Sequence, residues 1–439
     1  MGSYVPSTDL ERREMLSALG MHSEKELFED ISPQVRLKEE LCLPKGMSEL
    51  EVRRNIMGLA NKNKVFSSVF RGAGAYRHFI PAIVKSVTSK ESLLTAYTPY
   101  QPEISQGILQ SIFEYQTMIC ELTGMDVSNA SVYDGATAAA ESIMMCQERK
   151  RSKVFISRTV NPFVLETVQT YCFGKNLELI IIPEQNGVTN LSFIENNVDA
   201  ATACVYIQQP NFYGSFEDGE KIGELVHSAG AKYIMGVNPI SLGIAKTPRE
   251  YGADIAVGEG QPLGLPLSFG GPYLGFMATV DSMKRKLPGR IVGQTKDLNG
   301  KIGYVLTLQA REQHIRREKS SSNICSNEAL CALAAGVYLS AMGESGLRKV
   351  AVQSMSKAHY LAERLGELGY RLVNKKEFFN EFVSESPKPI SEVMNLLESR
   401  GILGGFPLRG ENEGKILWCC TEMNSKDDID ELIRILQGV

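Results

Sequence analysis

Hydrophobic residues in the middle of the chain follow two alternating patterns. At positions 104, 108, 112, 115, 119 and 122 they recur at helical spacing, which predicts an amphipathic helix over 104–122. Short runs of consecutive apolar residues then alternate with helix-length stretches such as 217–229, which Gly230 ends. The runs, each expected to form a buried strand, lie at 154–156, 179–182, 204–207, 233–235, 254–257 and 274–277. This alternation indicates an α/β domain on a largely parallel sheet with helices on both faces.

The two ends of the chain carry different patterns. Residues 1–65 contain short charged helical segments at 24–30 and 49–61 with little core of their own, and such an arm is expected to wrap a body or a partner. Near the other end, helices are expected at 327–341, 347–368 and 426–436, the last capped by Asn424 or Ser425, and strands at 370–373, 378–382 and 416–418. We therefore expect an N-terminal helical arm (1–65), a large α/β domain (66–344) and a small C-terminal α+β domain (345–439).

Composition narrows the class of protein. The 439 residues are 43% hydrophobic and 22% charged, which is ordinary for a soluble globular protein. The net charge of −4 gives no electrostatic footprint for nucleic acid. The charged stretch 8–14 lacks the apolar region of a targeting signal, and no run approaches the roughly 18 apolar residues of a membrane span. We expect a cytoplasmic protein without a membrane or nucleic-acid partner.

Cysteine and histidine spacing gives no metal site. The nine cysteines contain no C-x-x-C, and the five histidines lie far apart at 22, 78, 227, 314 and 359. Most of the cysteines sit in apolar runs, so we interpret them as core residues of a protein in a reducing compartment.

Ligands of open α/β sheets bind at the carboxyl ends of the strands, so the loops there are the candidate sites. The loop 258–272 has eight glycines or prolines and is either a structural turn cluster or a ligand loop. Segment 133–141 places a glycine before a helix of small residues, a weak signal for an anion site. Segment 97–106 combines two prolines with polar and aromatic tips, which favours binding. Segment 311–319 has four fixed positive charges and a histidine. It forms either a solvated helix face with internal ion pairs or a contact with a phosphate or an acidic partner.

Several strings resemble one family, the glycine decarboxylase P-protein. They include Thr95-Ala-Tyr-Thr-Pro-Tyr-Gln-Pro-Glu-Ile-Ser-Gln-Gly107 and Leu308-Gln-Ala-Arg-Glu-Gln-His-Ile-Arg-Arg-Glu318, with further strings at 113–116, 129–131, 133–137, 252–255, 270–272 and 322–325. The resemblance is to the N-terminal half of the single-chain enzyme, or to the first subunit where the halves are separate. It implies a fold-type-I pyridoxal-phosphate transferase fold, like that of aspartate aminotransferase. The implied reaction decarboxylates glycine and passes the aminomethyl group to the lipoyl arm of the H-protein, with the cofactor as electron sink.

Three positions depart from the half that carries the cofactor. The Schiff-base lysine of that half would fall at Gln261, and no lysine occurs between Lys246 and Lys284. Met235 stands where an aspartate pairs with the pyridine nitrogen, and Arg158 where a histidine stacks on the ring. The resemblance therefore implies that pyridoxal phosphate is bound covalently by a second subunit, and that this chain has no catalytic residue of its own.

Fold-type-I sites lie at a dimer interface, so the loops of this chain are expected to serve the partner's site. The resemblance implies an α2β2 or αβ assembly with this second subunit, and the lipoylated H-protein and glycine as further partners. Expected contributors to the partner's site are Tyr97, Thr98, Tyr100, Gln101 and Glu103; residues expected at the cofactor phosphate or the interface are Arg311, His314, Arg316, Arg317, Ser322 and Asn323. The alternatives are a self-sufficient enzyme that uses another lysine, such as Lys246, and a non-enzymatic regulatory or scaffold protein.

Overall fold

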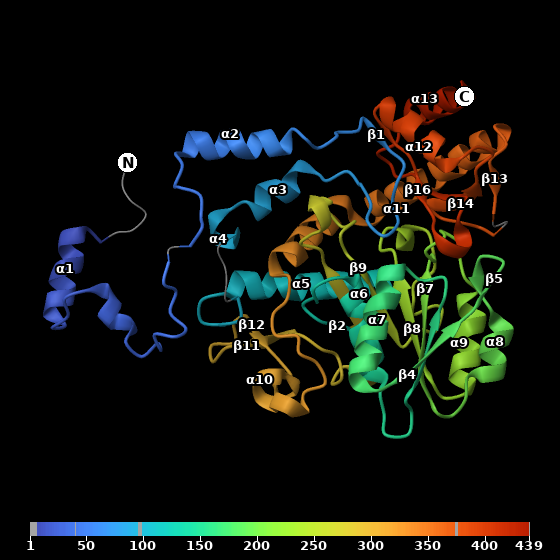
Figure 1. The fold of residues 1–439 in the computed structure, drawn as a ribbon. Coiled ribbons are helices and arrows are strands. Elements are labelled where there is room, and N and C mark those ends of the chain that lie inside the picture. The colour runs from blue at the N-terminus through green and yellow to red at the C-terminus, as the bar shows by residue number, and fades with distance from the viewer. Residues whose placement is uncertain (1–6, 40, 95–98, 374–375, 439) are drawn as a thin grey trace. The chain divides into compact units, whose positions relative to one another are not determined.

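A computed structural model describes residues 7–39, 41–94, 99–373 and 376–438. The chain forms two compact units, Met1–Lys64 and Val65–Val439 (Figure 1). The first unit contains α1 (Asp9–Ala18), the 3-10 helix η1 (Glu24–Phe28) and α2 (Glu49–Ala60). Capping boxes start α1 at Thr8 and α2 at Ser48, and no described residue of these helices is buried. The two predicted helical segments are therefore present, without a core of their own.

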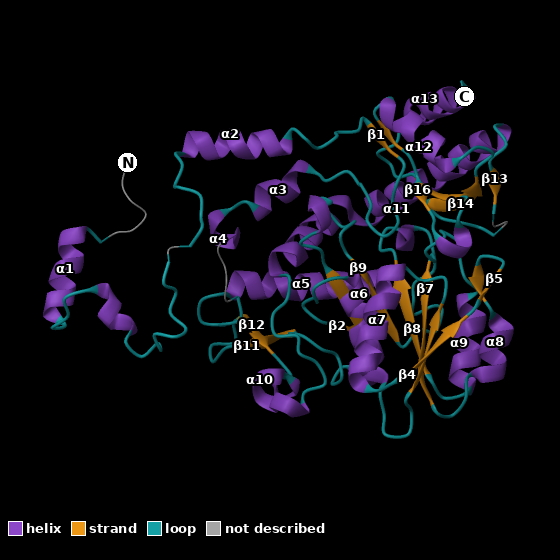
Figure 2. Cartoon of the chain, viewed as in Figure 1, coloured by secondary structure: helices purple, strands orange, loops and turns teal. Residues whose placement is uncertain are grey.

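A seven-stranded sheet forms the centre of the second unit, in the order β2-β10-β9-β8-β7-β3-β4 (Figure 2). Its strands are β2 (Val127–Ser128), β3 (Lys153–Ser157), β4 (Glu178–Ile182), β7 (Thr202–Gln209), β8 (Lys232–Val237), β9 (Ile255–Glu259) and β10 (Gly275–Thr279). Neighbours from β9 to β4 pair in parallel, whereas β10 is antiparallel to β9 and β2. All six predicted strands and the largely parallel sheet are confirmed.

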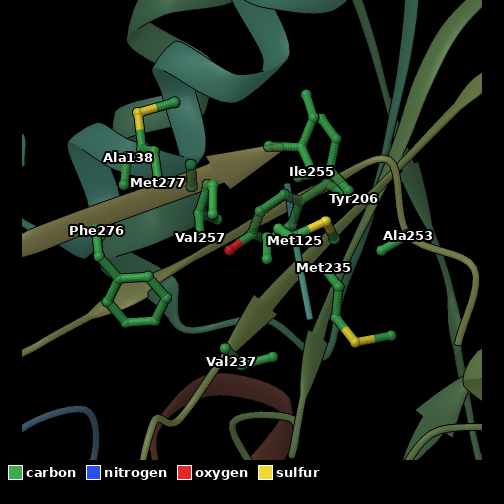
Figure 3. Close-up of a cluster of buried hydrophobic side chains, with 14 of the residues drawn as sticks. Met125, Ala138, Tyr206, Met235, Val237, Ala253, Ile255, Val257, Phe276 and Met277 are labelled. Carbon is green, nitrogen blue, oxygen red and sulfur yellow. The ribbon is translucent and has the colours of Figure 1, made fainter. Parts of the chain in front are cut away.

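Helices flank this sheet. They are α5 (Gln106–Thr123), α6 (Gly135–Cys146), α7 (Pro162–Lys175), α8 (Leu191–Asn197) and α9 (Gly219–Ser228). Helix α6 is buried from Thr137 to Cys146 and contacts β9 and β10, whereas α9 contacts β7 and β8. The core between them is mostly aliphatic and includes Tyr206, Met235 and Phe276 (Figure 3).

A long helix, α11 (Ala329–Glu367), leads out of this core. Gly343 breaks it, with φ of 59° and ψ of −178°, as the two separate predicted helices require. Among the described helices, α11 is the one whose length and apolar composition would suit a membrane crossing. Because it packs on α3 (Ala82–Thr88) and α5, we interpret it as a core helix of a globular protein.

The C-terminal part has its own four-stranded sheet, β13-β14-β17-β16, and a separate core around the buried Trp418. Its elements are β13 (Arg371–Leu372), β14 (Glu381–Glu385), α12 (Ile390–Ser399), β16 (Phe406–Pro407), β17 (Lys415–Cys419) and α13 (Lys426–Gln437). Ser425 caps α13, as predicted. The prediction of a strand at 378–382 is wrong by three residues, because Phe378 and Phe379 pair with the backbone of Ser215 and Gly214 before β14 begins.

The second unit also contains shorter α-helices and strands. They are α4 (Glu91–Leu94), α10 (Gln313–Arg316), the parallel pair β1 (Ser68–Val69) and β15 (Ile402–Leu403), and the hairpins β5 (Glu184–Gln185) with β6 (Val188–Thr189) and β11 (Val292–Lys296) with β12 (Ile302–Leu306). The division of 65–439 into a large and a small domain at residue 345 stays a prediction.

Candidate functional site

A cavity of about 740 Å³ opens at the carboxyl ends of the parallel strands. This is the position at which α/β sheets bind their ligands. The start of α6 and the ends of β7, β8 and β9 form its walls, together with segment 73–76. The lining comprises 73–76, 133–136, 163–164, 236–239, 258–259 and 270–273, with Asn161, Thr167, Tyr206, Gln208, Pro262 and Glu328. The predicted loops 133–141 and 258–272 therefore meet at one site.

Two carboxylates of the chain itself occupy the N-terminus of α6. The N-cap Asp134 accepts a hydrogen bond from the backbone N–H of Thr137 at 2.7 Å. Gly135 N–H donates to Glu259 Oε2 at 2.9 Å. A side chain at Gly135 would prevent this approach, because its Cβ would lie 2.9 Å from the backbone nitrogen of Glu259. The sequence predicted an anion site at the start of this helix, and the anions found there are the side chains of Asp134 and Glu259.

Glu259 is held by three backbone donors. Besides Gly135, the N–H groups of Gln261 and Leu274 donate to Glu259 Oε1 at 2.9 and 3.0 Å. Burial raises the pKa of Glu259, and the three hydrogen bonds act in the opposite direction. The carboxylate therefore fixes the end of β9 against α6.

Gln261 is buried beside the cavity, with 1% of its surface exposed. Its side-chain oxygen accepts from Tyr76 N–H at 2.9 Å, and its Nε2 donates to the carbonyls of Tyr76 and Leu265 at 3.0 and 2.7 Å. Gln261 does not line the cavity, whereas its neighbour Pro262 does. The amide thus ties the cavity segment 73–76 to the loop after β9.

The structure places Met235 and Arg158 away from the cavity. Met235 is buried and points toward α9, where its Cε lies 3.2 Å from the point that a Cβ on Gly219 would occupy. Side chains alternate along a strand, so the next residue, Gly236, reaches the cavity instead. Arg158 is exposed and does not line the cavity, whereas Asn161, three residues later, does. Neither Met235 nor Arg158 lines the cavity, and their correspondence to the cofactor-binding positions of the related half stays a prediction.

The described part of segment 97–106 does not line the cavity. Tyr97 and Thr98 lie outside the described residues. Tyr100 hydroxyl donates to Asn327 Oδ1 at 2.5 Å, and the Arg290 guanidinium lies 4.9 Å from the centre of its ring. Gln101 and Glu103 are exposed. Tyr100 therefore anchors the loop, whereas Gln101 and Glu103 face outward.

In the basic segment 311–319 and the residues after it, some side chains hold the local backbone and others are exposed. The Arg311 guanidinium donates to the carbonyls of Leu287 and Gly289, and burial lowers its pKa to about 10. Ser322 Oγ accepts from Ile324 N–H at 3.1 Å. His314, Arg316, Arg317 and Asn323 are exposed, and no residue of this set lines the cavity.

Much of the cavity's chemistry comes from five residues, Asn161, Tyr206, Gln208, Glu259 and Glu328. Glu259 lies within the predicted loop 258–272 but was not singled out as a site residue, and the other four lie outside the predicted loops. Glu259 offered a signal, because a carboxylate directly after a parallel strand points to a ligand edge. Tyr206 and Gln208 offered none, since they lie within a strand whose pleat decides which side faces the cavity.

The sheet order and the cavity at the N-terminus of α6 define a fold-type-I pyridoxal-phosphate transferase scaffold. Solved structures with this fold include a cysteine desulfurase from Thermococcus onnurineus, with a TM-score of 0.63 and 14% identity over 90% of this chain and 100% of that one. An aspartate aminotransferase from Thermus thermophilus gives a TM-score of 0.60, with 14% identity over 85% of this chain and 100% of that one. At such identities the likeness concerns the fold alone.

Closer comparisons identify the family. The family model for the glycine cleavage system P-protein matches residues 2–436. A probable glycine dehydrogenase (decarboxylating) subunit 1 from Moorella thermoacetica is 50% identical, over 100% of this chain and 99% of the relative. A crystal structure of inhibitor-bound glycine decarboxylase (P-protein) has a TM-score of 0.94 and 41% identity, with full coverage of both chains. The chain belongs to the glycine cleavage system P-protein family, which confirms the resemblance and the predicted fold.

The residues around the cavity do not fit pyridoxal phosphate. The cofactor needs an amine for its Schiff base and donors or cations for its phosphate. Among the described lining residues there is no lysine, arginine or histidine. The N-terminus of α6, which could otherwise receive a phosphate, faces Asp134 and Glu259.

Proposed function

We propose that this chain is the subunit of a heteromeric glycine decarboxylase that carries no pyridoxal phosphate of its own. A second subunit holds the cofactor covalently, and the complex decarboxylates glycine and transfers the aminomethyl group to the lipoyl arm of the H-protein. Family membership and the relatives named subunit 1 support this assignment. The observation that carries it is the hydrogen bond from Gly135 N–H to Glu259, because it puts a carboxylate where a phosphate would need a donor.

The exposed loops of the chain serve the partner's site in this proposal. Tyr100 fixes its loop through Asn327, so that Gln101 and Glu103 are presented to the partner's cavity. Tyr97 and Thr98, which lie outside the described residues, are proposed to contribute to the same site. The exposed side chains of the basic segment, His314, Arg316, Arg317 and Asn323, suit the interface or the phosphate of the partner's cofactor. Arg311 and Ser322 support this segment from within. The assembly is α2β2 and cytoplasmic.

One alternative loses its support. A self-sufficient enzyme would need an amine in the cavity, and Lys246 was the candidate. Lys246 is exposed, forms an ion pair with Glu220 and does not line the cavity. No observation favours a regulatory or scaffold role over the enzymatic one.

The test compares the chain alone, the second subunit alone and the two together. We expect glycine–bicarbonate exchange only from the pair, and the absorption of a lysine-linked cofactor only from preparations that contain the second subunit. Borohydride reduction followed by peptide mapping assigns the cofactor to a chain. A pyridoxyl-lysine peptide from this chain at stoichiometric yield would overturn the proposal, as would full exchange activity of this chain alone.

A further inference from the structure

The cavity has a strongly one-sided charge. Asp134, Glu259 and Glu328 line it, and no cationic side chain lies among its described lining residues. Burial and the charge of Asp134 both raise the pKa of Glu259 and of Glu328, so the three carboxylates share one electrostatic environment. Among the described residues, no side chain donates to the Glu328 carboxylate. An anionic ligand is repelled here and a cation is attracted.

The hydroxyl of a tyrosine with a buried ring lies in the same cavity. Tyr206 has 2% of its surface exposed, and within the described part of the chain its hydroxyl has no hydrogen-bond partner. The hydroxyl lies beside Gly236, where a Cβ would come within 2.1 Å of its oxygen. Because Tyr206 lines the cavity and no described group binds its hydroxyl, this oxygen is available to a ligand. The missing side chain of Gly236 thus makes room for this hydroxyl at the cavity wall.

The remaining lining suits an organic ligand better than a metal ion. Tyr133 and Phe163 are partly exposed aromatic rings of the lining, and aromatic faces attract organic cations. In the described part of the chain, no group of three or more His, Cys, Asp or Glu side chains is placed to hold a metal ion. The volume of about 740 Å³ lies within the range of small-molecule pockets.

We propose that this cavity binds a small organic molecule through a protonated amine, which lies among Asp134, Glu259 and Glu328 and donates a hydrogen bond to the hydroxyl of Tyr206. Glu259 has one acceptor position left after its three backbone hydrogen bonds, because an ionised carboxylate offers about four. Glu328 supplies the unpaired charge, and the aromatic rings receive the organic part. This proposal concerns the chain's own cavity and does not depend on which subunit holds the cofactor.

The test uses the full chain without its partner, so that no pyridoxal phosphate can react with an amine. Benzylammonium chloride is the probe, and benzyl alcohol and benzoate are its neutral and anionic counterparts; saturation-transfer NMR titrations give the dissociation constants. We expect saturable binding of benzylammonium, weaker binding of benzyl alcohol and none of benzoate. Because the partner is absent, a negative result leaves the proposed function standing.

Variants locate the binding. Glu328→Gln should weaken benzylammonium binding about tenfold, which corresponds to about 1.4 kcal/mol. Tyr206→Phe should weaken it about threefold through the lost hydrogen bond. Glu224→Gln on the exposed face of α9, where the carboxylate pairs with Lys221, is the matched control and should change nothing. Circular dichroism verifies each fold, and Asp134→Asn, which keeps the N-cap oxygen, replaces any variant that misfolds. Equal binding of the three probes overturns the proposal, as do unchanged constants in the cavity variants or the absence of saturable binding.

Discussion

Replacement of Gln261 by leucine tests how the cavity is held together. The two side chains are similar in size, but leucine cannot bond to the Tyr76 N–H, the Tyr76 carbonyl or the Leu265 carbonyl. A buried polar group left without a partner costs roughly 1–3 kcal/mol. Three such groups, with some relaxation, predict a loss of about 3–5 kcal/mol in the free energy of unfolding. That is a large share of the roughly 5–15 kcal/mol of a typical domain.

Equilibrium urea unfolding, followed by circular dichroism, measures this loss. The matched control is Gln169→Leu, since Gln169 is exposed on α7 and its replacement should change stability by less than about 0.5 kcal/mol. A shift in the Gln261→Leu variant no larger than that of the control would refute the reasoning. Such a result would mean that the three hydrogen bonds contribute nothing net, or that water replaces them.

Three further predictions concern Glu381, Glu103 and a lysine at position 261. Burial raises the pKa of Glu381 to about 7. The contribution of this group to stability is therefore complete below its ordinary pKa of 4.5 and is lost, by about 3 kcal/mol, as pH rises through 7. Urea unfolding midpoints between pH 4.5 and 8 should show this decline, and Glu381→Gln should flatten it. In the complex, Glu103→Gln should reduce glycine decarboxylation without dissociating the subunits; weaker assembly at unchanged activity per complex would instead assign Glu103 to the interface alone. Gln261→Lys, paired with a partner that lacks its Schiff-base lysine, should restore no activity, since Asp134 and Glu259 still face the phosphate position; recovered turnover would contradict this.

The sequence predicted those parts of the fold that local patterns determine. The runs at 154–156 and 204–207 were recognisable as strands because both faces of a central parallel strand are buried. The break at Gly343 followed from two separate helical stretches. The start of β14 was missed because Phe379 binds Gly214, a contact across more than 160 residues that no local pattern records.

The site was harder to predict for a similar reason. Gln261 was recognised by comparison with the lysine motif in the cofactor-carrying half of the family. The sequence itself showed that no lysine lies between Lys246 and Lys284. The orientations of Met235 and Gly236 depend on the pleat of β8, and a position in an alignment does not say which face of a strand it occupies. The bond between Gly135 and Glu259 joins residues 124 apart in the sequence, so it becomes visible only after the chain has folded.

In the proposed complex, the bond between Gly135 and Glu259 also bears on which subunit's cavity takes the phosphorylated cofactor. At an effective dielectric constant of about 20, two unit charges 4 Å apart repel by about 4 kcal/mol. A phosphate near Glu259 would therefore bind roughly a thousandfold more weakly than at a helix start without a carboxylate. In the proposed complex, this repulsion would disfavour a phosphorylated cofactor in the cavity of this chain and so contribute to its placement in the partner. Removal of Glu259 alone would leave Asp134 at the same helix end, so restoration of the phosphate site requires more than one substitution.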